Sequence, residues 1–312
     1  MAALETRIAR SYWVSDGVGI IDTGGYGTDH TVASYVVKGD RSAALVDVGY
    51  SSTWGRTAEG LAELGVARDK VEFIFLTHVH LDHAGAAWEA TNHFPNARLV
   101  VHEKGIRHLI DPSRLVGATR AGFGDQASHI GDMRSVQPER ISPAREERYD
   151  IGHRFIEPMF TPGHMPGHMS LVTGGGIVFT GDAVCVRKEG LGLIPAGSPP
   201  IYDVAAAVKS LERIEEEKPD VILAPHFGKY PERGKDLGRH METIQGWKDK
   251  ISARLDEGQN LQQVTASMRD SLLIGAGLEE SSLDDYSAKV LLGRLLGMTV
   301  EGYMGYLLAA KA

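Results

Sequence analysis

Short apolar runs separated by polar turns dominate the first two thirds of the chain. Runs of about four to eight residues that are rich in β-branched side chains and bounded by turn residues are typical of β-strands. The turn sequences GGYG and KGD separate the first three of these runs. The pattern predicts strands at residues 18–22, 31–37, 43–48, 71–76, 98–101, 154–160, 169–172, 177–180 and 221–223.

Apolar residues at helical spacing predict helices between several of these strands, at residues 53–64, 84–94 and 202–217. From about Gly234 onward the pattern is helical throughout, in segments such as YSAKVLLGRLL and VEGYMGYLLAAK. Strands mixed with helices and then helices alone are typical of an α/β body with a helical addition. We therefore expect an α/β domain at residues 1–233 and a helical C-terminal extension, residues 234–312, packed on it.

Two segments stand apart from this pattern. Residues 111–150 are polar, rich in Gly and Pro, and carry little periodicity, so we expect a lid or insert there, either ordered or mobile. The C-terminal helices carry a stripe of large apolar residues, which is typical of a core or of a contact between two copies of the chain. A homodimer through these helices is therefore an expectation to test.

Composition narrows the class of protein. The chain has 312 residues, of which 42% are hydrophobic and 24% charged, as in an ordinary soluble protein. A formal net charge of −8 argues against a nucleic-acid partner, since phosphate binding requires clustered Lys and Arg. No run approaches the ~20 apolar residues of a membrane span, which argues against a membrane partner. The N-terminal MAALETRIAR lacks an apolar signal segment and Cys185 is the single cysteine, so we expect a cytoplasmic protein.

Metal-binding residue types follow four of the predicted strands, in the motifs THVHLDH (77–83), TPGHMPGH (161–168), FTGD (179–182) and APHFG (224–228). In an extended chain alternate side chains share a face, so His78 and His80 can bind one ion together. Asp82 and His83 lie where the chain turns into a helix and can face a second ion. Imidazole and carboxylate ligands without a thiolate suit Zn²⁺, and also Fe or Mn.

Two ions placed a few Å apart favour a carboxylate that bridges them. Asp182, alone at the end of a predicted strand, suits that position. His164 and His226 would then complete the two ligand sets. These residue types predict a centre of two divalent metal ions, with zinc as the leading expectation.

The four motifs resemble those of the metallo-β-lactamase superfamily. HVHLDH is similar to its HxHxDH signature, and the other three motifs resemble its remaining ligand loops in the same order. The resemblance covers about residues 30–230 and implies an αββα sandwich, two packed mixed β-sheets flanked by helices. Carried over by position, it implies a first metal on His78, His80 and His164. It implies a second metal on Asp82, His83 and His226, with Asp182 between the two and with Thr77, Gly85 and His168 supporting their geometry.

The implied chemistry follows from charge. Two divalent ions facing two carboxylates leave a cationic site that acidifies a bridging water. The resulting hydroxide attacks a carbonyl or phosphoryl centre, and Asp82 is the candidate to orient it or to transfer a proton. We expect a metal-dependent hydrolase for a small-molecule thioester, ester or lactone.

Within the superfamily, several activities stay open. Glyoxalase II-like thioesterases share the ligand set, but their glutathione-binding segment is not recognisable in DAVCVRKEGLG. Lactonases place a tyrosine three residues beyond the bridging aspartate, where this chain has Cys185, unless Tyr202 or Tyr26 reaches the site. A mononuclear iron enzyme resembling the persulfide dioxygenases, a phosphoester or phosphotriester hydrolase, and a non-catalytic metal or ligand sensor are the alternatives. Metal stoichiometry separates the first of these from the dinuclear hydrolase.

Overall fold

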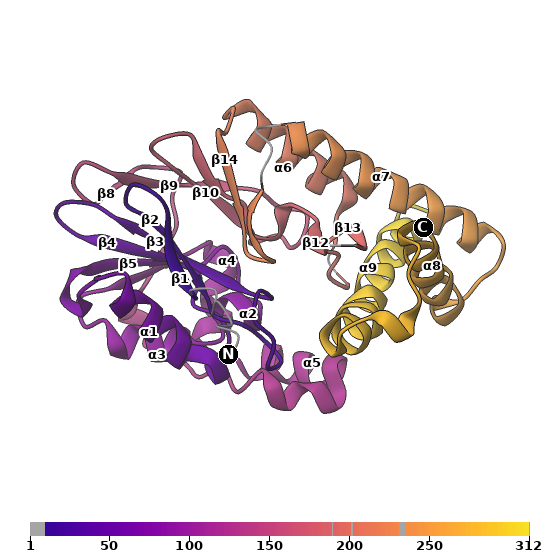
Figure 1. The fold of residues 1–312 in the computed structure, drawn as a ribbon, viewed down its shortest axis with the longest axis horizontal. Coiled ribbons are helices and arrows are strands. Elements are labelled where there is room, and N and C mark those ends of the chain that lie inside the picture. Colours follow the sequence, from indigo (N-terminus) through magenta and orange to yellow (C-terminus); the bar gives the residue numbers. More distant parts are fainter. Residues whose placement is uncertain (1–9, 189, 201, 231–234, 312) are drawn as a thin grey trace, which may run out of the picture.

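The computed structural model describes residues 10–188, 190–200, 202–230 and 235–311. The predicted domain boundary at 233/234 and the N-terminal segment 1–9 lie outside these residues. Two β-sheets pack face to face with helices on their outer sides (Figure 1). The first sheet has the order β1 (Ser11–Ser15), β2 (Val18–Asp22), β3 (Ala33–Lys38), β4 (Ala43–Val46), β5 (Val71–Phe75), β6 (Arg98–Val101) and β7 (Ile141–Pro143). This architecture confirms the predicted αββα sandwich.

The second sheet is also mixed. Its order is β15 (Gly228–Tyr230), β14 (Val221–Ala224), β11 (Ile177–Phe179), β10 (Met169–Thr173), β9 (Phe155–Phe160) and β8 (Tyr149–Asp150). β11 and β14 run parallel, so their carboxyl ends leave the sheet at the same edge. In the first sheet β4, β5 and β6 are parallel as well. Loops that follow these strands therefore gather at one edge of the sandwich.

The strands of the first sheet are buried on both faces. Ile20, Tyr35 and Phe75 point into the core between the two sheets. Their neighbours Ile21 and Val36 point the other way, into the core beneath the outer helices. Because both faces are covered, these strands read as continuous apolar runs, which made them visible in the sequence.

Helices cover the outer faces of both sheets. On the first sheet these are α1 (Trp54–Glu63) and α3 (Ala87–His93), with the one-turn α2 (Leu81–Ala84) before α3. α4 (Glu103–Ile110) follows β6. On the second sheet α6 (Val204–Glu216) buries Leu211 and Ile214 in one core with Val178 and Ile222.

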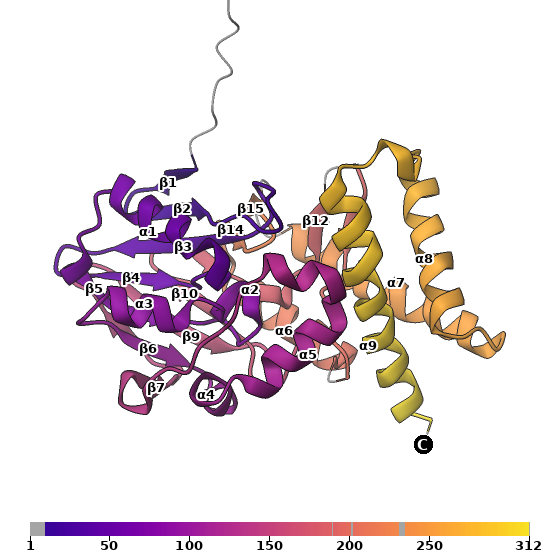
Figure 2. The ribbon, with the colours of Figure 1, turned by 90° about the horizontal axis from the view of Figure 1, so that it is seen from below.

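The C-terminal helices form a separate layer beside the sandwich (Figures 1 and 2), and β8 lies at the opposite end of the molecule in Figure 1. They are α7 (Lys235–Asp256), α8 (Leu261–Ala276), the π-helical η7 (Tyr286–Leu295) and α9 (Leu296–Ala309). Their shared core contains Trp247, Val300 and Tyr303, so much of the C-terminal apolar stripe is buried within the chain. The helical extension predicted from the sequence is confirmed. No helix in the described residues is long and apolar enough to cross a membrane.

The segment 111–150 differs from its predicted weak structure. It contains α5 (Ser113–Phe123), short 3-10 turns, β7 and β8. Leu115 and Val116 pack against the core beneath the first sheet, and this tertiary contact stabilises a helix whose sequence shows little periodicity. The pattern also missed β1, β15, α4 and the hairpin of β12 (Val186–Lys188) and β13 (Gly192–Ile194). These elements are short, and β1, β12 and β13 are partly exposed.

Candidate metal centre

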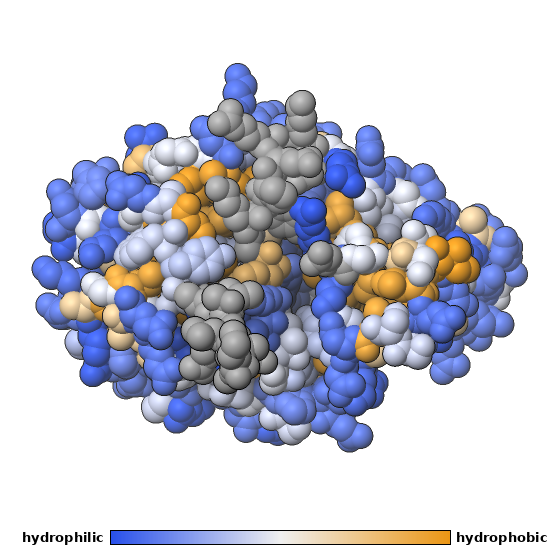
Figure 3. Space-filling model, in the orientation of Figure 1, coloured by the Kyte–Doolittle hydropathy of each residue, from blue (hydrophilic) through white to orange (hydrophobic). Residues whose placement is uncertain are grey.

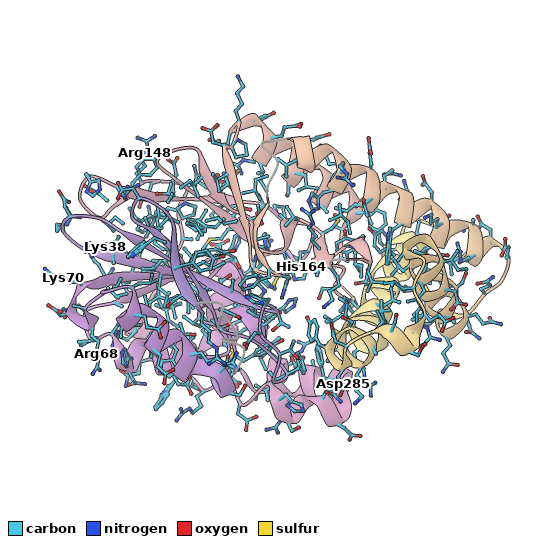
Figure 4. All side chains as sticks on the ribbon, in the orientation of Figure 1. Lys38, Arg68, Lys70, Arg148, His164 and Asp285 are labelled. Carbon is cyan, nitrogen blue, oxygen red and sulfur yellow. The ribbon has the colours of Figure 1, made fainter. Side chains whose placement is uncertain are left out.

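The structure brings all seven predicted side chains together at the edge where the parallel strands end. His78 and His80 follow β5, and Asp82 and His83 lie on α2. The other three come from the second sheet, where His164 lies between β9 and β10, Asp182 follows β11 and His226 follows β14. Figure 4 shows His164 near the middle of the molecule, between the sheets and the C-terminal helices.

One group contains three imidazoles. Nδ1 of His80 lies 3.0 Å from Nε2 of His78 and 2.8 Å from Nε2 of His164. The candidate ligand atoms of these histidines and of Asp182 all lie within 4.8 Å of one another. Three ring nitrogens converging on a carboxylate suit a cation of zinc type.

The other group joins α2 to the loop after β14. Oδ2 of Asp82 lies 3.6 Å from Nε2 of His83 and 3.4 Å from Nε2 of His226. The candidate ligand atoms of these three residues also lie within 4.8 Å of one another.

Asp182 stands between the groups and gives one carboxylate oxygen to each. Oδ2 lies 3.8 Å from Nε2 of His78 and 3.5 Å from Nε2 of His164. Oδ1 lies 3.5 Å from Nε2 of both His83 and His226. These separations resemble the ~3.3 Å between two ligands held at ~2 Å by one tetrahedral ion.

Two buried atoms test whether a metal fits. Oδ1 of Asp182 and Nε2 of His83 have no hydrogen-bond partner among the described residues. Leaving such polar groups buried and unsatisfied costs about 1–3 kcal/mol each. A cation at this point would satisfy both atoms, so the residues present fit a metal.

Hydrogen bonds on the far side of three rings fix their orientation. Nδ1–H of His164 donates to the carbonyl of Ala196 over 2.6 Å, and Nδ1–H of His226 donates to that of Thr31 over 3.0 Å. Nδ1–H of His83 donates to Oδ2 of Asp47 over 2.8 Å. Each bond leaves the Nε2 lone pair directed into the centre, as metal-binding histidines require.

Asp47 is a functional residue that the motifs did not reveal. Its carboxylate is buried and also accepts bonds from the backbone N–H and the hydroxyl of Thr77, over 2.8 and 2.9 Å. It therefore ties His83 to the start of the HVHLDH loop. A signal was present in LVDVG, where an acidic residue directly follows an apolar strand.

His168 has the supporting position that the resemblance implied. Its Nδ1–H donates to the carbonyl of Thr161 over 2.9 Å, and its Nε2 accepts the backbone N–H of Asp182 over 2.9 Å. Gly181 has φ +52, and a Cβ there would lie 2.5 Å from Nε2 of His168. The glycine of FTGD therefore lets His168 hold the backbone of Asp182.

The electrostatics of the two groups differ. Burial and neighbouring imidazoles lower the pKa of His78, and they lower that of His80 to about 3, so both stay neutral ligands. Burial also acts to lower the pKa of His83, but Asp82, Asp182 and Asp47 outweigh it and raise that pKa to about 10. The second group therefore favours positive charge, which a divalent cation would supply.

A cavity of about 470 Å³ lies over the centre. Its floor includes His80, Asp82, His164, Asp182 and His226. The face of the molecule drawn in Figure 3 carries hydrophobic surface on both sides of its middle, over the sandwich and over the C-terminal helices. Its walls come from α5, from the loop after β13 and from the C-terminal helices, and they include Leu115, Ala118, Gly122, Phe123, Ile194, Pro195, Leu291, Leu295 and Met298.

The tyrosines considered from the sequence do not line this cavity. Tyr202 packs on Tyr303 in the core of the C-terminal helices, with ring centroids 5.0 Å apart. Tyr26 packs against the rings of Phe123 and Tyr286 behind the wall. Cys185 is buried, as expected of a small hydrophobe, and burial raises the pKa of its thiol.

Two other phenols border the cavity. Tyr50 follows β4, and Tyr286 begins the π-helical segment η7. Tyr50 is almost fully buried, and Tyr286 packs against both the body and the C-terminal core. The cavity therefore takes its tyrosines from elements other than the loop after Asp182.

The fold and the centre together define an αββα sandwich whose strand ends hold paired His and Asp groups positioned for metal. A model of the metallo-beta-lactamase superfamily matches residues 27–226. The match covers more than half of the chain. The protein therefore belongs to the metallo-beta-lactamase superfamily.

Individual relatives agree with this assignment. The metallo-beta-lactamase fold-containing protein ST1585 of Sulfurisphaera tokodaii is 27% identical over 234 residues, covering 72% of this chain and 82% of its own length. An N-acyl homoserine lactonase, AttM of Agrobacterium fabrum, is 29% identical over 110 residues, covering 35% of this chain and 38% of its own.

Solved structures share the fold. The crystal structure of ST1585 superposes with a TM-score of 0.69 at 21% identity, covering 92% of this chain and 98% of its own. TTHA1429 of Thermus thermophilus superposes with a TM-score of 0.69 at 20% identity, covering 96% of this chain and 95% of its own. The coverage includes most of the C-terminal helices, so the helical extension is part of the shared architecture.

Proposed function

We propose that this protein is a dinuclear metal-dependent hydrolase of an ester, thioester or lactone with an apolar acyl group. The observation that carries the proposal is the position of Asp182. Its two oxygens face separate groups of histidines on the floor of a largely apolar cavity. A carboxylate shared in this way suits a pair of ions at one reaction site.

The proposed ligands follow the two groups. His78, His80 and His164 would hold one ion, Asp82, His83 and His226 the other, and Asp182 both. Divalent ions held there would polarise a carbonyl oxygen and lower the pKa of a bound water toward neutrality. Asp82 lines the cavity, so its carboxylate can also orient the attacking water or pass a proton to the leaving group.

The cavity wall supports the choice of substrate. The described lining residues include no Lys or Arg, which disfavours phosphoesters and other anionic substrates. Leu, Ile, Met and Pro side chains dominate the wall and suit an acyl group. The name of the relative AttM, an N-acyl homoserine lactonase, agrees with a substrate of this kind.

Metal content tests the proposal first. We expect about two equivalents of zinc, iron or manganese per chain, measured by inductively coupled plasma mass spectrometry on protein purified without added metal. Asp182→Ala should lose both the metal and the hydrolysis of thioesters and lactones. His153→Gln, at an exposed histidine remote from the centre, is the matched control and should keep both.

Other outcomes would contradict the dinuclear hydrolase. One equivalent of iron with oxygen consumption on persulfides would establish the dioxygenase alternative instead. Two metals without turnover of any ester, thioester or lactone would favour a sensor. We also propose a homodimer through the C-terminal helices, which a monomer by light scattering at micromolar concentration would overturn.

A further inference from the structure

One wall of the cavity is a helix face made of small residues. Ala118, Thr119 and Gly122 of α5 line the cavity, with Leu115 and Phe123 beside them. Gly122 lies in the last turn of α5 and presents no side chain to the cavity. Its place on the lined face leaves open a space that any larger side chain would occupy.

The opposite wall comes from the C-terminal helices. Leu291 and Leu295 of η7 and Met298 of α9 line it. A Cβ at Gly122 would lie 3.9 Å from Sδ of Met298, which is ordinary van der Waals contact. α5 lies beside these helices in both ribbon views (Figures 1 and 2). The two walls therefore come together at Gly122 and Met298, which bound the apolar space at this point.

This apolar space is continuous with the metal centre. The same cavity is lined by Asp82, Asp182 and His226 on its floor. A molecule with a polar group at the centre and an alkyl tail would place the tail between α5 and the C-terminal helices. Glu301, which is exposed, is the one charged residue among the described lining residues outside the floor. An anionic tail would gain nothing from this wall.

We propose that the space between α5 and the C-terminal helices is a subsite for the alkyl chain of the substrate, and that Gly122 and Met298 set the chain length accepted there. This inference rests on the proposed hydrolase and names the selectivity of the same site. A leucine at position 122 would meet Met298 and close the space, because packed walls leave little room for added volume.

The test uses Gly122→Leu with a control on the same helix. Gly117→Leu adds the same side chain to α5, but a Cβ at Gly117 meets nothing within 4 Å and Gly117 does not line the cavity. Both changes replace a helical glycine by a better helix former, so both variants should alter the stability of α5 to a similar extent. Met298→Ala enlarges the same apolar space by shortening a side chain of the opposite wall. This variant keeps the test valid if Gly122→Leu does not fold.

The first readout is kcat/KM for the 4-nitrophenyl esters of butyric, octanoic and dodecanoic acids. In the wild-type protein we expect a gain of up to about fourfold per buried CH₂ from butyrate to octanoate. Gly122→Leu should lower the octanoate to butyrate ratio at least about tenfold, while Gly117→Leu keeps the wild-type ratio. Met298→Ala should raise the dodecanoate to octanoate ratio.

A second readout needs no turnover. Calorimetry should show that octanamide binds the wild-type protein more tightly than butanamide, and that Gly122→Leu removes the difference. No hydrolysis of any ester, with the octanamide preference intact, would overturn the proposed function but keep the subsite. Equal kcat/KM across the chain lengths, or equal ratios for Gly122→Leu and Gly117→Leu, would overturn the subsite.

Discussion

Asp47 fixes the direction in which His83 faces the candidate metal centre. The imidazole donates from Nδ1 to the buried carboxylate over 2.8 Å, and its Nε2 then lies 3.5 Å from Oδ1 of Asp182. Asp47 has φ +56, an unusual conformation for a residue other than glycine. The backbone turn after β4 is thus shaped to place a carboxylate behind a candidate ligand.

Asp47→Asn tests this relationship. The amide keeps the size of the side chain but loses the negative charge, so we expect affinity at the second group to fall about 10–100-fold. A chelator competition titration measures it. Asp16→Asn removes an acidic charge from a fully exposed side chain and should leave the affinity unchanged. Equal metal affinities in Asp47→Asn and Asp16→Asn would contradict the role of Asp47.

The two groups should respond differently to loss of a ligand. His80→Ala removes one ligand from the first group, whereas Asp182→Ala removes the carboxylate shared by both. Each should lower activity more than about 100-fold, because losing a ligand costs more than losing its supporting bond. Mass spectrometry should find the second metal partly retained in His80→Ala and absent in Asp182→Ala. Full activity in either metal-depleted variant would refute the mechanism.

Chelation should destabilise the folded chain. Removing metal leaves the carboxylates of Asp82 and Asp182 without the divalent cation that would face them. At free metal about 1,000 times Kd, binding contributes about 4 kcal/mol to the free energy of unfolding. Urea unfolding with and without a chelator measures this difference. Asp182→Ala is the control, and a chelator effect of equal size in that variant would show that the metal binds elsewhere.

His240 should make stability depend on pH. Burial, with Arg239 and Arg187 nearby, lowers the pKa of this imidazole to about 4, against about 6.5 when unfolded. The unfolded chain therefore binds the proton first, and stability falls as the pH drops from about 6.5 to 4, by about 3 kcal/mol in total.

His240→Asn isolates this contribution. Its amide oxygen can still accept the backbone N–H of Cys185, which bonds to Nδ1 of His240 over 2.9 Å. Urea unfolding at several pH values should show a shallower decline for the variant than for the wild-type protein. The exposed His153→Gln should follow the wild-type curve. Parallel curves for His240→Asn and wild type would contradict the assignment.

The strands and the ligand motifs could be predicted because each depends on a short stretch of consecutive residues. β2 was predicted at its observed bounds, because Ile20 and Ile21 are buried on opposite faces and both are apolar. His78 and His80 converge with Asp182 because their motifs follow β5 and β11, strands of the two packed sheets. These features are encoded in segments of a few residues.

Other features depend on segments far apart in the chain. Asp47 supports His83 across 36 positions, and no local pattern connects them. Gly122 and Met298 meet only because α5 docks against α9, so α5 looked unstructured from its own sequence. Tyr286 was missed for the same reason, since it reaches the cavity from a helix beyond the family motifs.

The floor and the walls of the cavity come from different parts of the chain. Strand-end loops and the one-turn α2 supply the candidate ligands, whereas α5 and the C-terminal helices supply most of the apolar surface. A substitution on one of these helices can therefore alter which molecule enters without moving a ligand atom. The architecture lets new specificities evolve over an unchanged reaction centre.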